Sequence, residues 1–287
     1  MKNIAILGPG LLGGSVALAL RENTGVEVRL WARRAEAVEQ AKVMGVADVV
    51  TASVTEAVSG ADVVLLCVPV GAMPGLVHQI LPALSPDALV TDVGSVKEVV
   101  CNELGPVLEG RAHFIGSHPM AGSERAGIMA ARADLFQSAV CILTPEDGKT
   151  SEVALSRATS FWEKLGCRVR TLPPLLHDQI CALISHLPHL SAAALVNTVG
   201  AICPEALGFC GSGFRDSTRI AAGSPSMWTE ILLSNRTALA GSLRNLISIL
   251  EKMATRLECG DPSAESEIHH FLKTAKESRE SLDGRVW

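Results

Sequence analysis

The chain has 287 residues, of which 48% are hydrophobic and 19% charged, with a formal net charge of -5. This length suits two domains better than one, and the apolar content is enough for a large core and a subunit interface. The acidic balance argues against a nucleic-acid partner, which would usually need a basic face. With no Tyr, six Phe and four Trp, the chain also offers little aromatic surface for stacking on bases.

The beginning of the chain and its cysteines bear on its location. Met1-Lys2-Asn3 leads directly into an apolar run, without the charged segment and long apolar core of a signal peptide. The apolar window 63–77 is broken by Pro and Gly and is shorter than the about 18 residues of a membrane span. Eight Cys without a C-x-x-C pair indicate reduced thiols and no metal site. We therefore expect a cytoplasmic protein with no membrane partner.

Short β-rich apolar runs alternate with helical patterns in the first part of the chain. The runs are 3–7, 26–31, 62–68, 88–92, 113–117, 139–143 and 168–172. Such alternation is typical of an α/β fold in which helices flank a mostly parallel sheet. We predict a Rossmann-type domain over residues 1–172.

A different pattern follows Pro173-Pro174, which end the alternation. Long helical segments are predicted at 175–201, 225–258 and 264–281, with turns at 208–213 and 260–262. Residues 173–287 are therefore expected to form a separate, C-terminal all-helical domain.

A glycine motif follows the first predicted strand. Residues 8–13 read G-P-G-L-L-G, which fits G-x-G-x-x-G between a strand and the predicted helix 11–21, the context that dinucleotide binding requires. The first glycine permits the tight turn, the second lets a pyrophosphate approach, and the third lets the helix pack on the strand. The helix N-terminus attracts phosphate. The cofactor-binding candidates here are Gly8, Gly10, Leu11, Leu12 and Gly13.

The end of the second strand indicates which dinucleotide binds. An acidic residue for the ribose 2′-hydroxyl of NAD is expected about 20 residues after the glycines, but this strand ends in Trp31-Ala32-Arg33-Arg34. Two guanidinium groups favour a 2′-phosphate, hence NADP over NAD, although Arg33 and Arg34 could instead begin a solvated helix. Val68 and Pro69, at the end of the strand predicted at 62–68, are further cofactor-binding candidates.

The segment Thr91-Asp92-Val93-Gly94-Ser95-Val96-Lys97 lies at the C-terminal end of a predicted strand, where ligands collect in such sheets. Ser95 with Glu98 matches a capping box, so Ser95 is either a helix cap, a ligand contact, or both. Lys97 falls in the first turn of the next predicted helix, where the helix dipole disfavours a cation, which hints at a nearby anion.

Five motifs in order carry a resemblance to a known family. They are TDVGSVK (91–97), GSHPMAGSE (116–124), His177-Asp178, SHLPH (185–189) and GFRDSTR (213–219). With them the chain resembles the prephenate and arogenate dehydrogenases of tyrosine biosynthesis along nearly its whole length. The resemblance implies a Rossmann domain, a helical domain that forms a homodimer, and an active site between them. It also implies oxidative decarboxylation, with hydride transfer to NAD or NADP.

The resemblance assigns roles to single residues. His118 matches the family's catalytic histidine and would accept the proton of the ring hydroxyl, so we expect activity to fall as the pH drops through about 6.5. Arg219 and His186 match substrate-binding residues, and Ser95 is a candidate for both catalysis and substrate contact. From the residues alone, His118 could be a solvated or core histidine, Arg219 could lie with Arg215 on a solvated helix face, and His186 or His189 could satisfy a carbonyl freed by Pro188. We favour substrate contact for His186 and a structural role for His189.

Two other functions account for part of the sequence. Another oxidoreductase with a Rossmann and a helical domain, such as a hydroxyacid dehydrogenase or an imine reductase, would explain the glycine motif but not SHPMAGSE or SHLPH. A dinucleotide-sensing protein without turnover is the other alternative. No residue decides between prephenate and arogenate.

Overall fold

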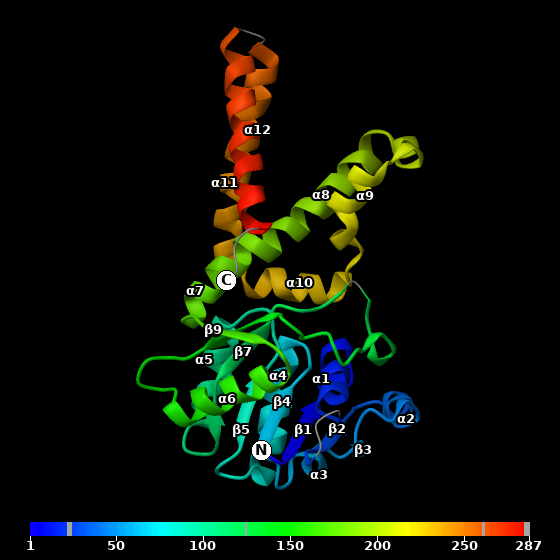
Figure 1. Cartoon of the computed structure of the whole chain (residues 1–287), viewed down its shortest axis with the longest axis vertical. Coiled ribbons are helices and arrows are strands. Elements are labelled where there is room, and N and C mark those ends of the chain that lie inside the picture. The colour runs from blue at the N-terminus through cyan, green and yellow to red at the C-terminus, as the bar shows by residue number, and fades with distance from the viewer. Residues whose placement is uncertain (22–24, 124, 260–261, 284–287) are drawn as a thin grey trace. The chain divides into compact units, whose positions relative to one another are not determined.

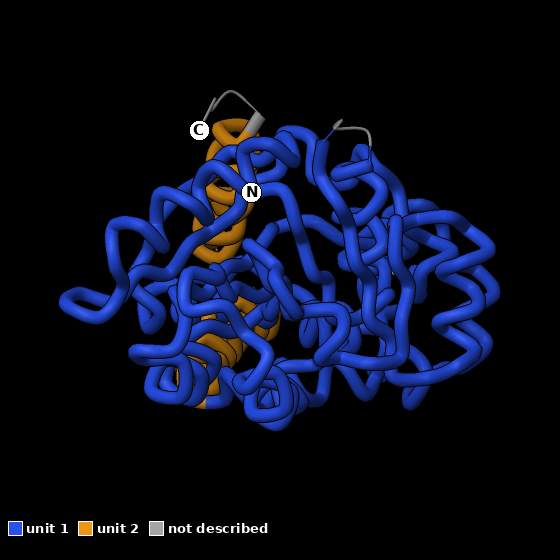
Figure 2. Tube along the Cα trace, turned by 90° about the horizontal axis from the view of Figure 1, so that it is seen from below, with its two compact units in different colours: residues 1–236 blue, residues 237–287 orange. Residues whose placement is uncertain are grey.

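The computed structural model describes residues 1–21, 25–123, 125–259 and 262–283. It divides into two compact units, residues 1–236 and 237–287 (Figure 2). The turn predicted at 260–262 begins outside the described residues, and the predicted domain boundary after residue 172 stays a prediction.

A six-stranded, all-parallel sheet forms the centre of the first unit (Figure 1). Its order is β3-β2-β1-β4-β5-β6, the usual Rossmann order, in which the direction of winding reverses between β1 and β4. The predicted Rossmann-type sheet is therefore confirmed. The short strand β3 was not predicted, because three residues carry too little pattern. The strands are β1 (Asn3–Leu7), β2 (Glu27–Trp31), β3 (Val49–Thr51), β4 (Val63–Leu66), β5 (Leu89–Asp92) and β6 (His113–Phe114).

Helices cover both faces of this sheet. Alternate residues of β1 enter different cores: Ile4 and Ile6 lie in one core with side chains of α1 and α6, whereas Ala5 and Leu7 lie in another with side chains of α3, α4 and α5. This two-sided burial explains why the strands read as continuous apolar runs. The helices are α1 (Leu11–Arg21), α2 (Ala35–Met44), α3 (Val54–Val58), α4 (Met73–Ile80), α5 (Glu98–Leu108) and α6 (Glu152–Lys164), with the short 3₁₀ turns η1 (Val70–Ala72), η2 (Leu81–Ala83) and η3 (Ile128–Ala130).

A second, three-stranded sheet holds β7 (Gly116–Pro119), β8 (Val140–Thr144) and β9 (Arg168–Thr171). The pair β7–β8 is antiparallel and β8–β9 is parallel. The strand predicted at 113–117 is thus wrong as one element, since it divides at Ile115 into β6 of the large sheet and β7 of the small one. His118 lies in β7, opposite Ile142.

Beyond residue 173 the described elements are all helical. A continuous helical run from Pro174 to Ile202 consists of α7, a π-helical segment η4 and α8. Pro188 lacks the N–H of a regular helix, which explains a local change of hydrogen-bond pattern there. The helix predicted at 225–258 is interrupted at Asn235, and the turn predicted at 208–213 overlaps η5 and α9. The elements are α7 (Pro174–Cys181), η4 (Ala182–His186), α8 (Leu187–Ile202), η5 (Pro204–Phe209), α9 (Ser212–Thr218), η6 (Arg219–Ala222), α10 (Pro225–Ser234), α11 (Arg236–Cys259) and α12 (Pro262–Asp283).

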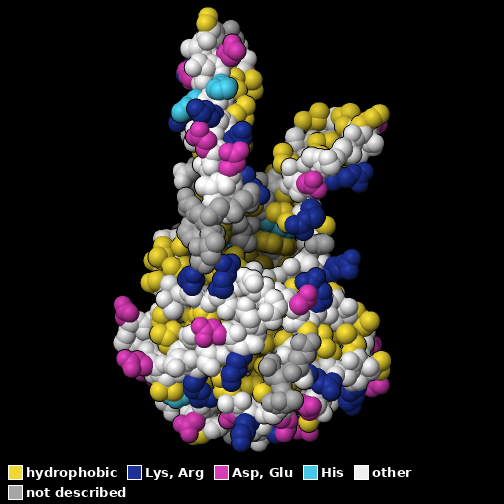
Figure 3. Space-filling view, in the orientation of Figure 1, with side chains coloured by type: hydrophobic (Ala, Val, Ile, Leu, Met, Phe, Trp, Pro, Cys, Tyr) yellow, Lys and Arg dark blue, Asp and Glu magenta, His cyan; other side chains and the backbone are white. Residues whose placement is uncertain are grey.

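The run from Pro174 to Ile202 is long and apolar enough, by length and composition, to cross a membrane, although no such segment was predicted from the sequence. Large apolar side chains on α8 and η5 are exposed, among them Leu195, Ile202 and Phe209. Figure 3 shows hydrophobic side chains on the surface of the part formed by α8 and η5. The same run carries buried polar residues, including Asp178 and His186, so it is not uniformly apolar.

Candidate active site

A cavity of about 650 Å³ lies at the C-terminal ends of β1, β2 and β4. Gly8 has φ +126°, and a Cβ there would lie 2.2 Å from the carbonyl oxygen of Cys67, so only glycine fits. A Cβ on Gly13 would lie 2.0 Å from the carbonyl oxygen of Gly8. Among the described residues, apart from its immediate chain neighbours, nothing lies within 4 Å of the corresponding position on Gly10, which leaves open space before the N-terminus of α1. This arrangement fits a pyrophosphate.

The cavity brings together most of the predicted cofactor residues. Gly8, Gly10, Arg33, Arg34, Val68 and Pro69 all line it. Leu11, Leu12 and Gly13 do not line it. They lie in the first turn of α1, and Leu11 and Leu12 remain candidates through their backbone N–H groups. The described residues around the cavity include two arginines and no Asp or Glu.

A buried ion pair ties the loop after β5 to strand β7. Lys97, which is fully buried, contacts the carboxylate of Asp92 through its ammonium group. The same carboxylate accepts the N–H of Gly94 at 2.7 Å and of Ser117 at 3.0 Å. The anion that the position of Lys97 indicated is therefore Asp92 of the protein itself. Because Ser117 precedes His118, these contacts fix the strand that carries the histidine.

The N-terminus of α5 is capped from a distant part of the chain. Asp178 accepts the backbone N–H of Lys97 at 2.7 Å and of Glu98 at 3.0 Å. The capping box predicted from Ser95 and Glu98 is wrong, because α5 begins only at Glu98 and its cap residue is Lys97. Ser95 is half-buried in the preceding loop, and its contact with a ligand stays a prediction.

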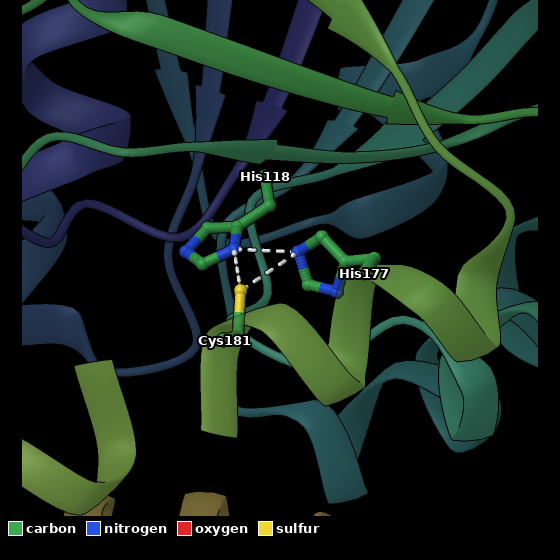
Figure 4. Close-up of side chains that lie close together, drawn as sticks. All are labelled: His118, His177 and Cys181. Atoms are coloured by element: carbon green, nitrogen blue, oxygen red, sulfur yellow. Dashed lines mark hydrogen bonds between the residues drawn. The ribbon is translucent and has the colours of Figure 1, made fainter. Parts of the chain in front are cut away.

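His118 is the first member of a chain of buried hydrogen bonds (Figure 4). Its Nδ1 lies 2.9 Å from Nε2 of His177, whose Nδ1 lies 2.7 Å from the carboxylate of Asp178. His118 is only 7% exposed and His177 is fully buried. In Figure 4 the other nitrogen of His118, Nε2, points away from His177 and Cys181.

Burial lowers the pKa of His118 well below 6.5, and the neighbouring His177, Lys97 and His186 lower it further. The ring is therefore neutral near pH 7. A neutral imidazole can accept a proton at one nitrogen while it donates from the other.

Cys181 lies beside both rings, 3.4 Å from Nε2 of His177 and 3.8 Å from Nδ1 of His118. Two His and one Cys form a donor set that suits zinc. The two nitrogens are nevertheless only 2.9 Å apart, less than the about 3.3 Å that follows from Zn–N bonds in a tetrahedron. Burial also raises the pKa of the Cys181 thiol to about 12. Hydrogen bonds among the three side chains explain these distances without a metal ion. The absence of a metal site stays a prediction.

His186 is buried at the end of η4 and is held by Asn235. Its Nδ1 lies 3.1 Å from Nδ2 of Asn235, which donates to the backbone oxygen of Asp178 at 2.7 Å. No hydrogen-bond partner for the buried Nε2 is found in the described parts of the chain. Burial lowers the pKa of His186 to about 4. The carbonyl freed by Pro188 is not its partner.

His189 stacks on Trp228, with ring centroids 3.5 Å apart and planes inclined by 12°. Trp228 also meets His186 edge-on, at 6.3 Å. These contacts support the structural role that we favour for His189.

Arg219 and Arg215 are not on one regular helix. Arg215 lies in α9, which ends at Thr218, and donates from Nε to the backbone oxygen of Cys210 at 3.3 Å. Arg219 begins η6, which packs against α8, the helix that directly follows His186. Its side chain is exposed, and its contact with substrate stays a prediction.

Several site residues could not be assigned a role from the sequence. His177 and Asp178 were noted only as part of a motif, and Asp92, Cys181, Trp228 and Asn235 had no assigned role. One signal was present: His177 and Cys181, four positions apart, share a helix face. Asn235 gave no such signal, because it lay inside the single helix predicted at 225–258.

Comparisons with known proteins agree along most of the chain. Residues 16–171 match the family domain described as "Prephenate dehydrogenase, nucleotide-binding domain", and residues 173–274 match "Prephenate dehydrogenase, dimerization domain". The chain is 36% identical over 280 residues to the cyclohexadienyl dehydrogenase of Zymomonas mobilis, with 96% of this chain and 94% of that protein covered.

Two solved structures are similar in fold and sequence. The prephenate dehydrogenase of A. aeolicus, in complex with hydroxyphenyl propionate and NAD+, has a TM-score of 0.90 at 32% identity, with 98% of each chain covered. The Synechocystis arogenate dehydrogenase has a TM-score of 0.81 at 31% identity, with 98% of this chain and 100% of that chain covered. With both domains matched, the chain belongs to the prephenate dehydrogenase family of oxidoreductases.

Proposed function

We propose that this enzyme oxidises and decarboxylates prephenate or arogenate, with His118 as the base. The His118 ring carries the proposal: it is buried, its pKa is lowered, and its Nδ1 is engaged by His177. Nε2 is then the ring atom that can meet a substrate hydroxyl. A base at the C4 hydroxyl is what this reaction requires, because the oxygen must lose its proton as hydride leaves the same carbon.

The chain's own residues perform the other steps. A dinucleotide held by the glycine motif would supply the hydride acceptor for C4 of the substrate ring. His118 takes the hydroxyl proton at Nε2, and the ring carboxylate leaves as carbon dioxide while the ring becomes aromatic. Arg219 binds a substrate carboxylate through its guanidinium group. His186 donates a hydrogen bond to a substrate oxygen, because its depressed pKa keeps the ring neutral and its Nε2 has no partner among the described residues.

The nucleotide-binding domain and the glycine cavity support a dinucleotide cofactor. We infer that it is NADP rather than NAD. This preference is supported by Arg33 and Arg34 on the cavity wall, where no acidic residue is found among the described lining residues. The A. aeolicus structure contains NAD+, which concerns the cofactor of that protein and does not decide the cofactor of this chain.

We infer that the enzyme is a homodimer that assembles through its C-terminal part. The match of residues 173–274 to a dimerization domain and the exposed apolar side chains on α8 and η5 support this. If a partner chain covers these side chains, the apolar character of residues 174–202 is explained by the dimer interface, and no membrane is needed to explain it. All eight cysteines lie in described parts and are free, which agrees with the expected cytoplasmic location.

The test is turnover by the purified protein. Prephenate and arogenate are each supplied with NAD+ and with NADP+, and reduced nicotinamide and carbon dioxide are measured together. Equal amounts of both products with at least one substrate are expected. Reduction without carbon dioxide, or turnover only of hydroxyacids or imines, would make the protein a different oxidoreductase. Cofactor binding without turnover of either class would favour the sensing function.

A further inference from the structure

We propose that Asp178, acting through His177 and Asn235, holds His118 and His186 in opposite tautomers. His118 would carry its proton on Nδ1 and present Nε2 as an acceptor, whereas His186 would carry its proton on Nε2 and present a donor. The roles of the two rings toward substrate rest on the proposed function. The positions of the protons rest only on the hydrogen bonds of the protein.

The carboxylate of Asp178 fixes the tautomer of His118 through His177. Its oxygens face the backbone N–H groups of Lys97 and Glu98, which can only donate, so the carboxylate accepts. Nδ1 of His177, at 2.7 Å, therefore carries a hydrogen toward it. In a neutral imidazole the other nitrogen, Nε2, then has a lone pair. Nδ1 of His118 lies 2.9 Å from Nε2 of His177 and must therefore donate to it. Nε2 of His118 is left as the acceptor.

The backbone carbonyl of Asp178 fixes the tautomer of His186 through Asn235. This oxygen can only accept, so the atom of Asn235 that lies 2.7 Å from it is the amide nitrogen. An amide nitrogen has only hydrogens to offer, so Nδ1 of His186, at 3.1 Å, accepts from it. The single proton of neutral His186 is then on Nε2. This buried N–H has no partner among the described residues, as expected of a donor intended for a ligand.

Opposite tautomers match two different tasks. A substrate hydroxyl that must lose its proton needs an acceptor, and a carbonyl or carboxylate oxygen that must be held needs a donor. With the tautomers exchanged, His118 would offer an N–H to the hydroxyl and could not take its proton. His177, Asp178 and Asn235 are therefore positioning residues, because they act on the substrate through other rings.

The first experiment reads the tautomers without any substrate. The protein is prepared with ring-¹³C histidine, and its NMR carbon shifts distinguish Nδ1–H from Nε2–H rings, with His118→Asn and His186→Asn used to assign the two signals. We expect Nδ1–H for His118 and Nε2–H for His186 at neutral pH. The opposite form at either ring would overturn the proposal for that ring, whatever the activity of the enzyme.

The second experiment compares two substitutions at His177. His177→Gln can still donate toward Asp178 and accept from His118, whereas His177→Phe keeps the bulk and loses both functions. The Phe variant should lower kcat about 10²-fold or more with little change in KM, and the Gln variant should stay within about fivefold of the parent. Equal kcat in the two variants would show that His177 is only a packing residue.

A third substitution tests the other half. In Asn235→Asp the amide nitrogen is replaced by an acceptor, so the His186 proton should move to Nδ1 in the NMR spectrum, and KM for substrate should rise about tenfold. An unchanged His186 signal in a folded variant would overturn this half. If the variant does not fold, the spectrum of the parent still decides. A parent that is inactive on prephenate and arogenate but shows both expected tautomers would refute the proposed function and not this inference.

Discussion

The carboxylate of Asp178 accepts the backbone N–H of Lys97, which lies 81 positions earlier in the chain, at 2.7 Å. This contact joins the helical run that begins at Pro174 to the N-terminus of α5. One oxygen of the same carboxylate also meets His177. Helix capping and the support of His118 therefore depend on a single side chain.

Asp178→Asn should destabilise the protein. The amide offers one acceptor where the carboxylate offers two, so at least one of the three donors that face it loses a strong partner. Loss of a helix N-cap costs about 0.5–2 kcal/mol, and we expect the free energy of unfolding to fall by at least this much. Urea denaturation measures the change. The control is Asp216→Asn on the exposed surface of α9, and equal stability of the two variants would contradict the capping role.

The same contact shows what the sequence could predict and what it could not. β1 and α1 were predicted to the residue, because apolar alternation and the glycine motif are local signals. Ser95 was a plausible local cap for α5, yet the side chain that accepts the first N–H groups of α5 is that of Asp178, on a distant helix that no local pattern reveals. Residues 113–117 were predicted as one strand, because periodicity does not show to which sheet each residue belongs. His118 and His186 were found by resemblance, whereas their partner Asn235 was not.

His118→Asn should retain the fold and cofactor binding and lower kcat by about 10² to 10⁴, the usual contribution of a general base. The matched control is His269→Asn, at an exposed position on α12, which should keep the parental kcat. Steady-state kinetics and cofactor titration separate the two effects. A kcat within threefold of the parent in His118→Asn would move the base to another residue.

The pH profile should differ from the one expected from the sequence alone. Activity needs neutral His118, so it is present above the folded pKa and is lost as the pH falls through it. Burial places that pKa well below 6.5, and the neighbouring His177, Lys97 and His186 lower it further. Two other titratable groups are near: the Cys181 thiol faces the ring, and the Asp178 carboxylate lies beyond His177. We therefore expect kcat/KM to stay level through pH 6.5 and to fall only at lower pH. If kcat/KM, measured by initial rates across this pH range, falls with a midpoint at pH 6.5, His118 is solvated in the working enzyme.

Arg219→Ala should raise KM for substrate strongly and leave cofactor affinity nearly unchanged. A hydrogen bond to a charged group contributes about 1.5–3 kcal/mol, which corresponds to roughly ten- to more than a hundredfold in KM. Arg215→Ala is the matched control, since it removes another exposed arginine four positions away. If the two variants change KM equally, Arg219 does not contact the substrate directly and contributes only to the positive charge of this surface.

Arg33→Ala tests the choice of cofactor. If Arg33, supported by Arg34, meets the 2′-phosphate, the parent should prefer NADP over NAD by about ten- to a hundredfold in kcat/KM, from one charge-assisted hydrogen bond. The substitution should remove most of this preference by weakening NADP alone, because both dinucleotides share the remaining contacts. Lys42→Ala, which removes an exposed cation from α2, should change neither cofactor, and Gly10→Val should weaken both, because its side chain would enter the space open to the pyrophosphate. Equal use of NAD and NADP by the parent would mean that Arg33 and Arg34 face solvent and that the ribose is held elsewhere on the cavity wall.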